Sequence, residues 1–398
     1  MKIDDKTSHN SPFIRFPEFT GEWKEFELGD IARVVGGGTP DTNNRRYWNG
    51  NIQWFTPSEI GKNKYVSNSL RTISEEGLNS SSAKLLPIGT ILLSSRATVG
   101  ECSINKRECT TNQGFQSLIP KENFLNEFVF YLMQTKRKEL IRKSCGSTFL
   151  EISANEVRKI KIAVPTRIEQ EKISKLLALL DERIVVQNRL IEDLKKLKSA
   201  IIEEHYRRAE KQSVLVSDLG EPFNVGNLSK EDLTTTGTPC VIYGELFTTY
   251  GAIINHVESY TNKTGGMTLS KKGDLLFPSS TTVDAMSLIA PSVINIDNVI
   301  LGGDMFGIHI NPDFNAQYLS YFLNYIAKSQ FAKYAKGSTI IHLHYKDIAK
   351  AKLLLPCLEE QNRMAKCLVS LDEKINMETT LLDLQNRQKI YLLRKMFI

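Results

Sequence analysis

The sequence predicts an α+β protein that is built twice, with two globular bodies and two long antiparallel helices that form a coiled coil in a pseudo-two-fold internal repeat. Three observations support this prediction. Short motifs recur at one constant spacing, apolar runs in each half follow glycine turns, and each half ends in a long stretch whose apolar residues are spaced as on a helix.

The repeat is defined by motifs that lie 191 residues apart. Gly146-Ser147-Thr148 recurs as Gly337-Ser338-Thr339, an offset of 191 (337 − 146). Chance matches would scatter over many offsets, so a single offset along the whole half indicates a duplication. The other motifs at this offset are Pro165 and Pro356, Glu169-Gln170 and Glu360-Gln361, Leu180-Asp181-Glu182 and Leu371-Asp372-Glu373, and Leu28-Gly29 and Leu219-Gly220.

The two bodies are predicted to be mixed domains with short strands. The runs 90–94 and 274–277 are apolar and follow glycine, as strands do. Helical spacing is found at 127–144 and 316–336, just before each Gly-Ser-Thr motif. The glycines of 36–40 form a loop, which is either a plain turn or a bare backbone that approaches phosphate.

The tails are predicted to be long helices. Residues 168–206 contain neither Pro nor Gly, and their apolar positions recur every three or four residues, as they do in 359–397. Gln187 and Glu378 interrupt the two stripes at matching positions. Each helix could pack on its own body only, but a stripe of this length favours helix on helix. The predicted segments are body 1–165, helix 166–210, body 211–356 and helix 357–398.

Composition indicates a globular protein without a dominant charge. The 398 residues carry 51 Lys and Arg against 45 Asp and Glu, a net charge of +6. A surface that is basic throughout needs a larger excess, so any nucleic-acid site must be local. The six cysteines form no C-x-x-C pair, which favours reduced thiols. The polar N-terminus and the lack of a long apolar run predict a cytoplasmic protein without a membrane segment.

No catalytic motif is expected. Residues 311–314 (Asn-Pro-Asp-Phe) lack the second proline of an amino-methyltransferase loop and are predicted to be a turn before a helix, and no phosphate-binding loop with its lysine is present. His342 and His344 would share one face of a strand, but Glu151 and Ser153 occupy the matching positions of the first repeat. We therefore expect surface or packing histidines, and neither a catalytic nor a metal site.

These motifs, taken in order, resemble the specificity (S) subunits of type I restriction-modification systems. The resemblance covers essentially the whole chain, although Gly302-Gly303-Asp304 stands in the second body where Thr111-Asn112-Gln113 stands in the first. The motifs that carry the resemblance are Phe16-Pro17-Glu18-Phe19, Gly21-Glu22-Trp23, Leu28-Gly29-Asp30, Gly37-Gly38-Thr39-Pro40, the run 95–100, Thr111-Asn112-Gln113 and both tails.

The resemblance implies a DNA-recognition subunit that is not itself an enzyme. Each body would be a target recognition domain for one half of a bipartite double-stranded DNA site. The helices would set the spacing between the half-sites and bind two methyltransferase (M) subunits, which use S-adenosylmethionine to methylate adenine. Restriction (R) subunits would add ATP- and Mg-dependent translocation and cleavage. This chain would bind no cofactor.

The residue types suggest which side chains contact DNA. Asn and Gln pair with adenine and Arg pairs with guanine, while Lys contacts phosphate. In the first body the predicted contacts are Gly37, Gly38, Thr39, Lys62, Lys64, Arg96, Thr98, Asn112 and Gln113. In the second body they are Thr249, Tyr250, Ser279, Ser280, Thr281 and Thr282.

Two other functions are compatible with the sequence. The chain could be a coiled-coil structural adaptor with no DNA role, or the specificity portion of another restriction-methylation enzyme. Salt-dependent and sequence-selective DNA binding would separate the first alternative from a recognition subunit.

Overall fold

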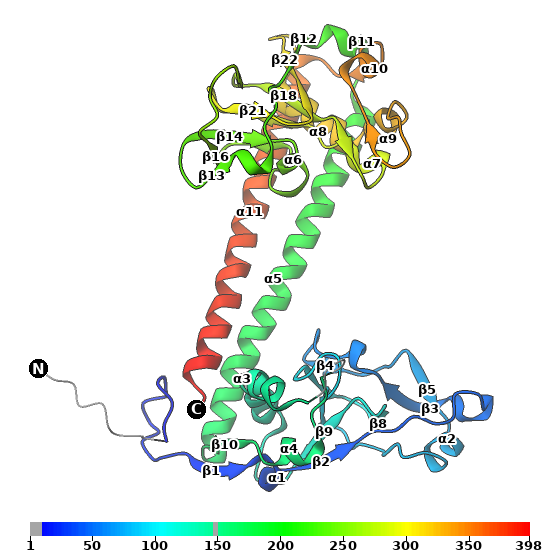
Figure 1. The fold of residues 1–398 in the computed structure, drawn as a ribbon, viewed down its shortest axis with the longest axis vertical. Helices are drawn as coiled ribbons and strands as arrows, with labels where there is room; N and C mark the ends of the chain where they lie inside the picture. The colour runs from blue at the N-terminus through cyan, green and yellow to red at the C-terminus, as the bar shows by residue number, and fades with distance from the viewer. Residues whose placement is uncertain (1–9, 146–149) are drawn as a thin grey trace, which may run out of the picture. The chain divides into compact units, whose positions relative to one another are not determined.

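The computed structural model describes residues 10–145 and 150–398, which form two compact units (Figure 1). Unit 1 contains the chain up to Gln187 and residues 381–398, and unit 2 contains residues 188–380. Helices α5 (Arg167–Arg208) and α11 (Leu358–Lys395) are therefore each divided between the two units. Both helices were predicted from the tails. The first Gly-Ser-Thr motif lies outside the described residues.

The described body of unit 1 contains three sheets and the helix α3, and the smallest sheet pairs β1 (Lys24–Glu27) with β10 (Lys161–Val164). Strands of the five-stranded sheet are ordered β2 (Ala32–Gly36), β9 (Gln116–Pro120), β6 (Ile91–Leu93), β7 (Cys102–Asn105) and β4 (Tyr65–Val66). The three-stranded sheet is ordered β5 (Arg71–Ile73), β3 (Trp48–Phe55) and β8 (Cys109–Thr111). Helix α3 (Asn126–Lys143) has seven fully buried residues in the core of this unit, and its bounds follow the predicted helical pattern.

The body of unit 2 repeats the order of the five-stranded sheet despite its divergent sequence, and its second sheet has five strands instead of three. Its first sheet is ordered β12 (Gly220–Asn224), β22 (Met305–Ile310), β18 (Asp274–Pro278), β20 (Ser292–Ile294) and β15 (Ile253–Ile254). The second sheet is ordered β13 (Leu233–Thr234), β16 (Ser259–Thr261), β14 (Thr238–Ile242), β21 (Ile300–Gly302) and β17 (Thr268–Leu269). The parallel pair β3–β8 corresponds to the parallel pair β14–β21. The second predicted helix is shorter than expected, with α8 (Ala316–Tyr325) followed by a separate α9 (Lys328–Ala332).

One motif equivalence predicted from the sequence is wrong. In unit 1 the backbone N–H of Glu27 donates to Asp30 Oδ2 at 2.9 Å, and in unit 2 the backbone N–H of Leu215 donates to Asp218 Oδ2 at 3.1 Å. These equivalent turns lie 188 residues apart (218 − 30), and each leads directly into the edge strand β2 or β12. The identity of Leu28-Gly29 and Leu219-Gly220 at offset 191 is therefore coincidental, because hydrogen-bonded pairing defines the equivalence of backbone positions.

The repeated Pro and Gln hold the start of each long helix against its body. Gln170 Nε2 donates to the carbonyl of Pro165 at 3.1 Å, and its Oε1 accepts from the backbone N–H of Leu125, the residue before α3, at 3.0 Å. Gln361 makes the same two hydrogen bonds, to Pro356 at 2.8 Å and from Asn315 at 3.0 Å. Each glutamine is 2% exposed, so both ends of a buried amide are satisfied.

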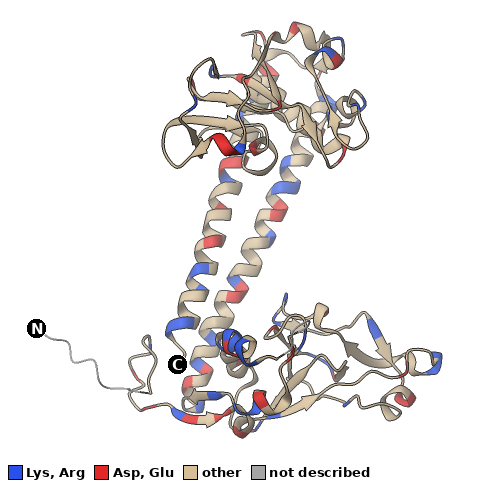
Figure 2. Cartoon of the chain, viewed as in Figure 1, with Lys and Arg blue, Asp and Glu red and all other residues tan. Residues whose placement is uncertain are grey.

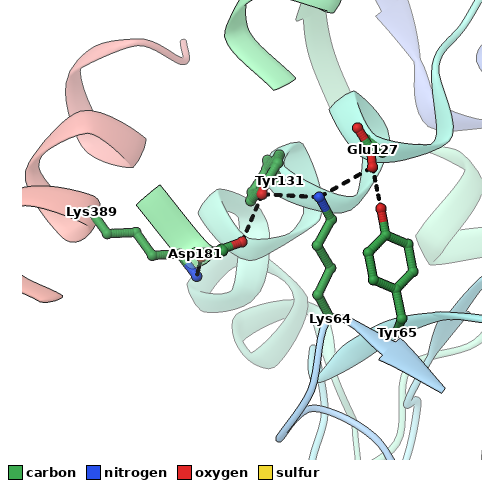
Figure 3. A network of polar contacts seen from close by, with 6 residues as sticks. All are labelled: Lys64, Tyr65, Glu127, Tyr131, Asp181 and Lys389. Carbon is green, nitrogen blue, oxygen red and sulfur yellow. Dashed lines mark hydrogen bonds and ion pairs between the residues drawn. The ribbon is translucent and has the colours of Figure 1, made fainter. Parts of the chain in front are cut away.

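The repeated Asp of the Leu-Asp-Glu motif joins three elements in each unit, and Figure 3 shows the arrangement in unit 1. In unit 1 Asp181 accepts a hydrogen bond from the Tyr131 hydroxyl at 2.7 Å and forms an ion pair with Lys389 of α11 at 2.7 Å. In unit 2 Asp372 accepts from Tyr321 at 2.6 Å and pairs with Lys198 of α5 at 2.5 Å. Burial and the neighbouring carboxylate raise the pKa of both tyrosines, which remain donors.

The two helices run antiparallel within each unit. In unit 2 Lys198 pairs with Asp372, while the later residue His205 hydrogen-bonds to the earlier residue Glu360 at 2.9 Å. The helices also pack on the bodies, since Ile173 and Leu177 are buried in the core of unit 1 together with the end of α11. Helix-on-helix and helix-on-body packing, considered as alternatives from the sequence, both occur.

The C-terminal end of each helix completes a core. Met396 and Phe397 are 2% and 7% exposed in unit 1, where the Phe397 ring stacks on Phe128 and meets Trp23 edge-on. In unit 2 the equivalent aromatic ring is Tyr206, which contacts Phe322 with ring centroids 5.4 Å apart. α11 therefore ends in the core of unit 1, and α5 ends in the core of unit 2.

Candidate nucleic-acid interface

Three chain segments meet at one place in unit 1, here called junction 1 (residues 94–98, 111–115 and 150–153). The backbone N–H of Ser95 donates to the carbonyl of Gly114 at 2.8 Å, and the carbonyl of Ser95 accepts from Ile152 at 3.1 Å. Glu151 exchanges two backbone hydrogen bonds with Cys145, at 2.9 and 3.0 Å. These bonds bring together residues that are far apart in the sequence.

Unit 2 has the same arrangement, here called junction 2 (residues 278–282, 302–306 and 336–344). The backbone N–H of Ser279 donates to Asp304 at 2.8 Å, and the carbonyl of Ser279 accepts from Leu343 at 2.9 Å. His342 exchanges two backbone hydrogen bonds with Lys336, at 2.9 and 2.7 Å. The backbone scaffold of the two junctions is therefore the same, whereas the side chains on it differ.

Junction 1 presents several of the predicted DNA contacts. Arg96 forms an ion pair with Glu151 at 2.8 Å, and their side chains are 44% and 40% exposed. Ala97 at the loop tip has φ 58°, an uncommon conformation for a residue with a Cβ, and Thr98 beside it is exposed. Exposed Gln113 accepts a hydrogen bond from Thr39 Oγ1 at 2.5 Å. Arg96 is thus partly exposed and Thr98 and Gln113 are exposed, so a ligand can reach all three side chains.

Other residues predicted in the first body have packing roles. A Cβ on Gly37 would lie 2.0 Å from the carbonyl oxygen of Asn112, and Gly38 is buried with its N–H bonded to Thr111 and its carbonyl bonded to Trp54. The glycines allow close chain packing, which corresponds to the plain turn. Asn112 Oδ1 accepts from the backbone N–H of Gly114 at 2.9 Å and holds the 112–114 turn.

The two predicted phosphate contacts differ in accessibility. Lys62 is exposed. Lys64 is only 12% exposed, and its ammonium group donates to Glu127 at 3.3 Å and to the Tyr131 hydroxyl at 3.1 Å (Figure 3). The prediction of Lys64 as a phosphate contact therefore does not fit its position, because the charge is already paired inside the unit.

In the second body, two predicted contacts are part of the core or the scaffold. Tyr250 is 9% exposed, and its hydroxyl accepts from the backbone N–H of Glu258 at 3.1 Å. Ser279 is 3% exposed and supplies the backbone bonds of junction 2. Neither side chain is placed to contact DNA, since each belongs to the interior.

The remaining predicted residues of the second body are more open, with one exception. Ser280 is 8% exposed and pairs with His342 in the short ladder of β19 (Ser280–Thr281) and β23 (Ile341–His342). Thr281 is half-buried, whereas Thr282 and Thr249 are exposed.

A polar group in junction 2 was not predicted to contact DNA. His342 and His344 lie with their rings nearly parallel, at 17° and with centroids 6.0 Å apart. With neighbouring charged residues they line one surface hollow, whose members are Asp304, Lys336, Gly337, His342, His344, Lys346 and Asp347. The sequence contained one indication that His342 belongs to the site. The offset of 191 aligns His342 with Glu151, which forms an ion pair with the predicted contact Arg96.

The glycine of the second Gly-Ser-Thr motif shapes this hollow. Gly337 has φ 120°, and a Cβ there would lie 2.0 Å from the carbonyl oxygen of Ile340. This conformation favours glycine, and Ser338 and Thr339, which follow it, are exposed.

Charge over the described residues is mixed. Lys and Arg alternate with Asp and Glu along both helices and over both bodies, as Figure 2 shows. Within the described ranges, no group of three His, Cys, Asp or Glu residues could hold a metal ion. The helices of those same ranges include none that is long and apolar enough to cross a membrane. Residues 311–314 form a turn before α8, as predicted.

Comparison with known proteins gives one consistent result. The type I restriction enzyme MjaIX specificity subunit of Methanocaldococcus jannaschii is 37% identical over 180 residues, or 44% of this chain and 42% of that protein. The EcoR124I/EcoR124II specificity subunit of Escherichia coli is 30% identical over 184 residues, or 44% of this chain and 45% of that protein. The matched stretch thus spans less than half of either relative.

The fold also matches a solved structure over nearly the whole chain. The S subunit of a type I restriction-modification system from M. genitalium superposes with a TM-score of 0.61 at 15% identity, covering 98% of this chain and 99% of that one. At this identity the likeness concerns the fold.

The family model described as the type I restriction modification DNA specificity domain matches residues 20–196 and again residues 210–385. These two matches correspond to the two repeats, each with its body and its long helix. The chain therefore belongs to the family of type I restriction modification DNA specificity domains, and it carries two copies of that domain.

Proposed function

We propose that this chain is the DNA specificity subunit of a type I restriction-modification complex, in which each body reads one half of a bipartite target. The observation that carries the proposal is the pair of junctions. They share one backbone scaffold, yet Arg96, Glu151 and Gln113 of junction 1 are replaced by other side chains in junction 2. Equal scaffolds with different base-contacting groups are what two readers of different sequences require.

The repeated helices support the binding of two copies of one partner. Val186 and Leu190 on α5 are 67% and 39% exposed, and the residues 191 positions later on α11, Met377 and Leu381, are 62% and 39% exposed. Exposed apolar residues on a charged helix are candidates for protein contact. The partners would be two methyltransferase subunits, which hold S-adenosylmethionine and methylate adenine, joined by restriction subunits that use ATP and Mg.

The chain itself would carry no chemistry and no cofactor, and it would act in the cytoplasm, where its DNA is. The helices would set the distance between the two half-sites. Since α5 is one continuous helix of 42 residues, its length is fixed by the sequence between the two bodies.

The deciding experiment is methylome sequencing of a host that expresses the methyltransferase subunit with and without this chain. We expect adenine methylation at one bipartite motif only when the chain is present. Binding of the purified complex to that motif should weaken steeply with salt and should exceed binding to scrambled DNA. Methylation that is absent, or independent of this chain, would refute the proposal.

A further inference from the structure

The side chains that can donate a hydrogen bond from nitrogen lie on different segments in the two junctions. In junction 1 the cation is Arg96, on the segment after β6, and Glu151 lies across the backbone bridge. In junction 2 the bridge joins Ser280 to His342. Junction 2 therefore has the buried Ser280 at the position of Arg96. It has a histidine, His342, at the position of Glu151.

The chemistry of junction 2 is therefore concentrated on the segment 336–346. His344 and Lys346 are exposed and Lys336 is 75% exposed, whereas Ser280 is 8% exposed. Among the described residues, no hydrogen bond or ion pair occupies the ring nitrogens of His342. A side chain in the interior cannot reach a base, so the predicted serines are poorly placed compared with the histidines.

The acidic neighbours have separate roles. Asp347 forms an ion pair with Lys336 at 2.5 Å and accepts the backbone N–H of His344 at 3.2 Å, which fixes the segment that bears the histidines. Asp304 is exposed, and its carbonyl accepts from Ser279 the backbone hydrogen bond that Gly114 accepts from Ser95 in junction 1. An exposed carboxylate can accept from the amino group of cytosine, and a histidine ring N–H can donate to N7 or O6 of guanine.

We propose that His342 and His344 are the main base-reading side chains of the second body, with Asp304 as a further base contact and Lys336 and Lys346 on the adjacent phosphates. The ligand is the major-groove edge of double-stranded DNA in the second half-site. This inference rests on the proposed function and assigns its second reader to residues other than the 279–282 loop.

The test is methylome sequencing of cells that express the methyltransferase subunit with the wild-type chain, His342→Ala, His344→Ala or the double variant. His256→Ala is the matched control, because His256 is also in unit 2 and its side chain is 77% exposed but lies outside the hollow. Arg96→Ala is the reciprocal control for the first body.

We expect the double variant to lose about 5- to 150-fold in methylation of the full motif, the span of one mismatched base pair. Sites that remain methylated should keep the first half-site and show a relaxed second half-site. Arg96→Ala should relax the first half-site alone, and His256→Ala should change neither. An unchanged second half-site in the double variant would overturn the inference.

Two further outcomes are informative. If the wild-type chain directs no bipartite methylation, the proposed function fails before the histidines are tested. If the double variant abolishes all methylation, a second double variant with His342→Gln and His344→Gln is tested, because glutamine retains polar donors and acceptors. Restored methylation with an altered second half-site supports the inference, and restored methylation with the original half-site contradicts it.

Discussion

The hydroxyl of Tyr131 donates a hydrogen bond to Asp181 Oδ2 at 2.7 Å, joining α3 to α5 inside unit 1. Tyr321 and Asp372 repeat this bond in unit 2 at 2.6 Å. The repeated Leu-Asp-Glu motif is therefore explained by an anchor between body and helix, since in each unit the aspartate also pairs with a lysine of the other long helix.

Tyr131→Phe should lower the free energy of unfolding of unit 1 by about 1.5 to 3 kcal/mol, the range for a hydrogen bond to a charged group. Tryptophan fluorescence during urea denaturation measures this unit selectively, because Trp23, Trp48 and Trp54 all lie in it. Tyr65→Phe is the control, since that hydroxyl donates to Glu127 at the exposed surface. If both substitutions lowered the free energy of unfolding equally, the Tyr131–Asp181 hydrogen bond would not be a specific anchor between α3 and α5.

Phe397→Ala should destabilise unit 1 by about 3 kcal/mol, because it removes a buried aromatic ring from the core. The midpoint of the same fluorescence transition should move to a lower urea concentration. Tyr206→Ala, the equivalent change in unit 2, should leave the tryptophan transition in place and alter only the tyrosine region of the near-UV circular dichroism spectrum. A tryptophan transition that is insensitive to Phe397→Ala would show that the end of α11 does not belong to this core.

Acid should weaken unit 2 through Glu360. The hydrogen bond with His205 and the positive charge of Arg363 lower the pKa of this carboxyl. A lowered pKa means that the contribution of Glu360 to stability is present above its unfolded value of about 4.3 and is lost as the pH falls through the folded value.

Glu360→Gln should therefore be less stable than the wild type at neutral pH, and the difference should shrink below about pH 4. The measurement is thermal unfolding of unit 2 from pH 7 to pH 3, followed by near-UV circular dichroism. Glu359→Gln, on the exposed neighbour, should have little effect. A difference that stays constant down to pH 3 would exclude the carboxylate as its source.

Lengthening both helices should widen the methylated target. Four residues added after Leu190 and four after the equivalent Leu381 extend each helix by about 6 Å. This length is nearly two base pairs, at about 3.4 Å per base pair. Methylome sequencing should show unchanged half-sites with a longer gap. Active variants that methylate only the original spacing would rule out a role of the helices in spacing.

Several features of the fold were accessible from the sequence because they depend on local or repeated patterns. The spacing of apolar residues predicted α5 and α11 to within two residues of their bounds, since helical periodicity is a property of neighbouring residues. The offset of 191 predicted a duplication, and the five-stranded sheets of the two bodies share one strand order. It misled at Leu28, where the structural offset is 188, because a two-residue identity contains little information.

Burial is the property of the predicted site residues that the sequence did not reveal. Lys64, Tyr250 and Ser279 are of residue types that contact DNA, but each is turned inward and bonded to a neighbour within its own unit. His342 and His344 were assigned to surface or packing roles because no further ligand lay near them in the sequence. The surface hollow that they line also includes Lys336 of the same segment and Asp304, which comes from a segment more than 30 residues earlier.

The sequence by itself determined the duplication, the long helices and the family resemblance, because each is encoded in periodicity or in the order of short motifs. Only the tertiary structure decided which side chains share a site. Arg96, Gln113 and Glu151 meet in junction 1 through backbone hydrogen bonds between distant segments, and the same bonds place His342 opposite Ser280 in junction 2. Such contacts depend on chain reversals whose geometry is set by packing of the whole body, so no local pattern contains them.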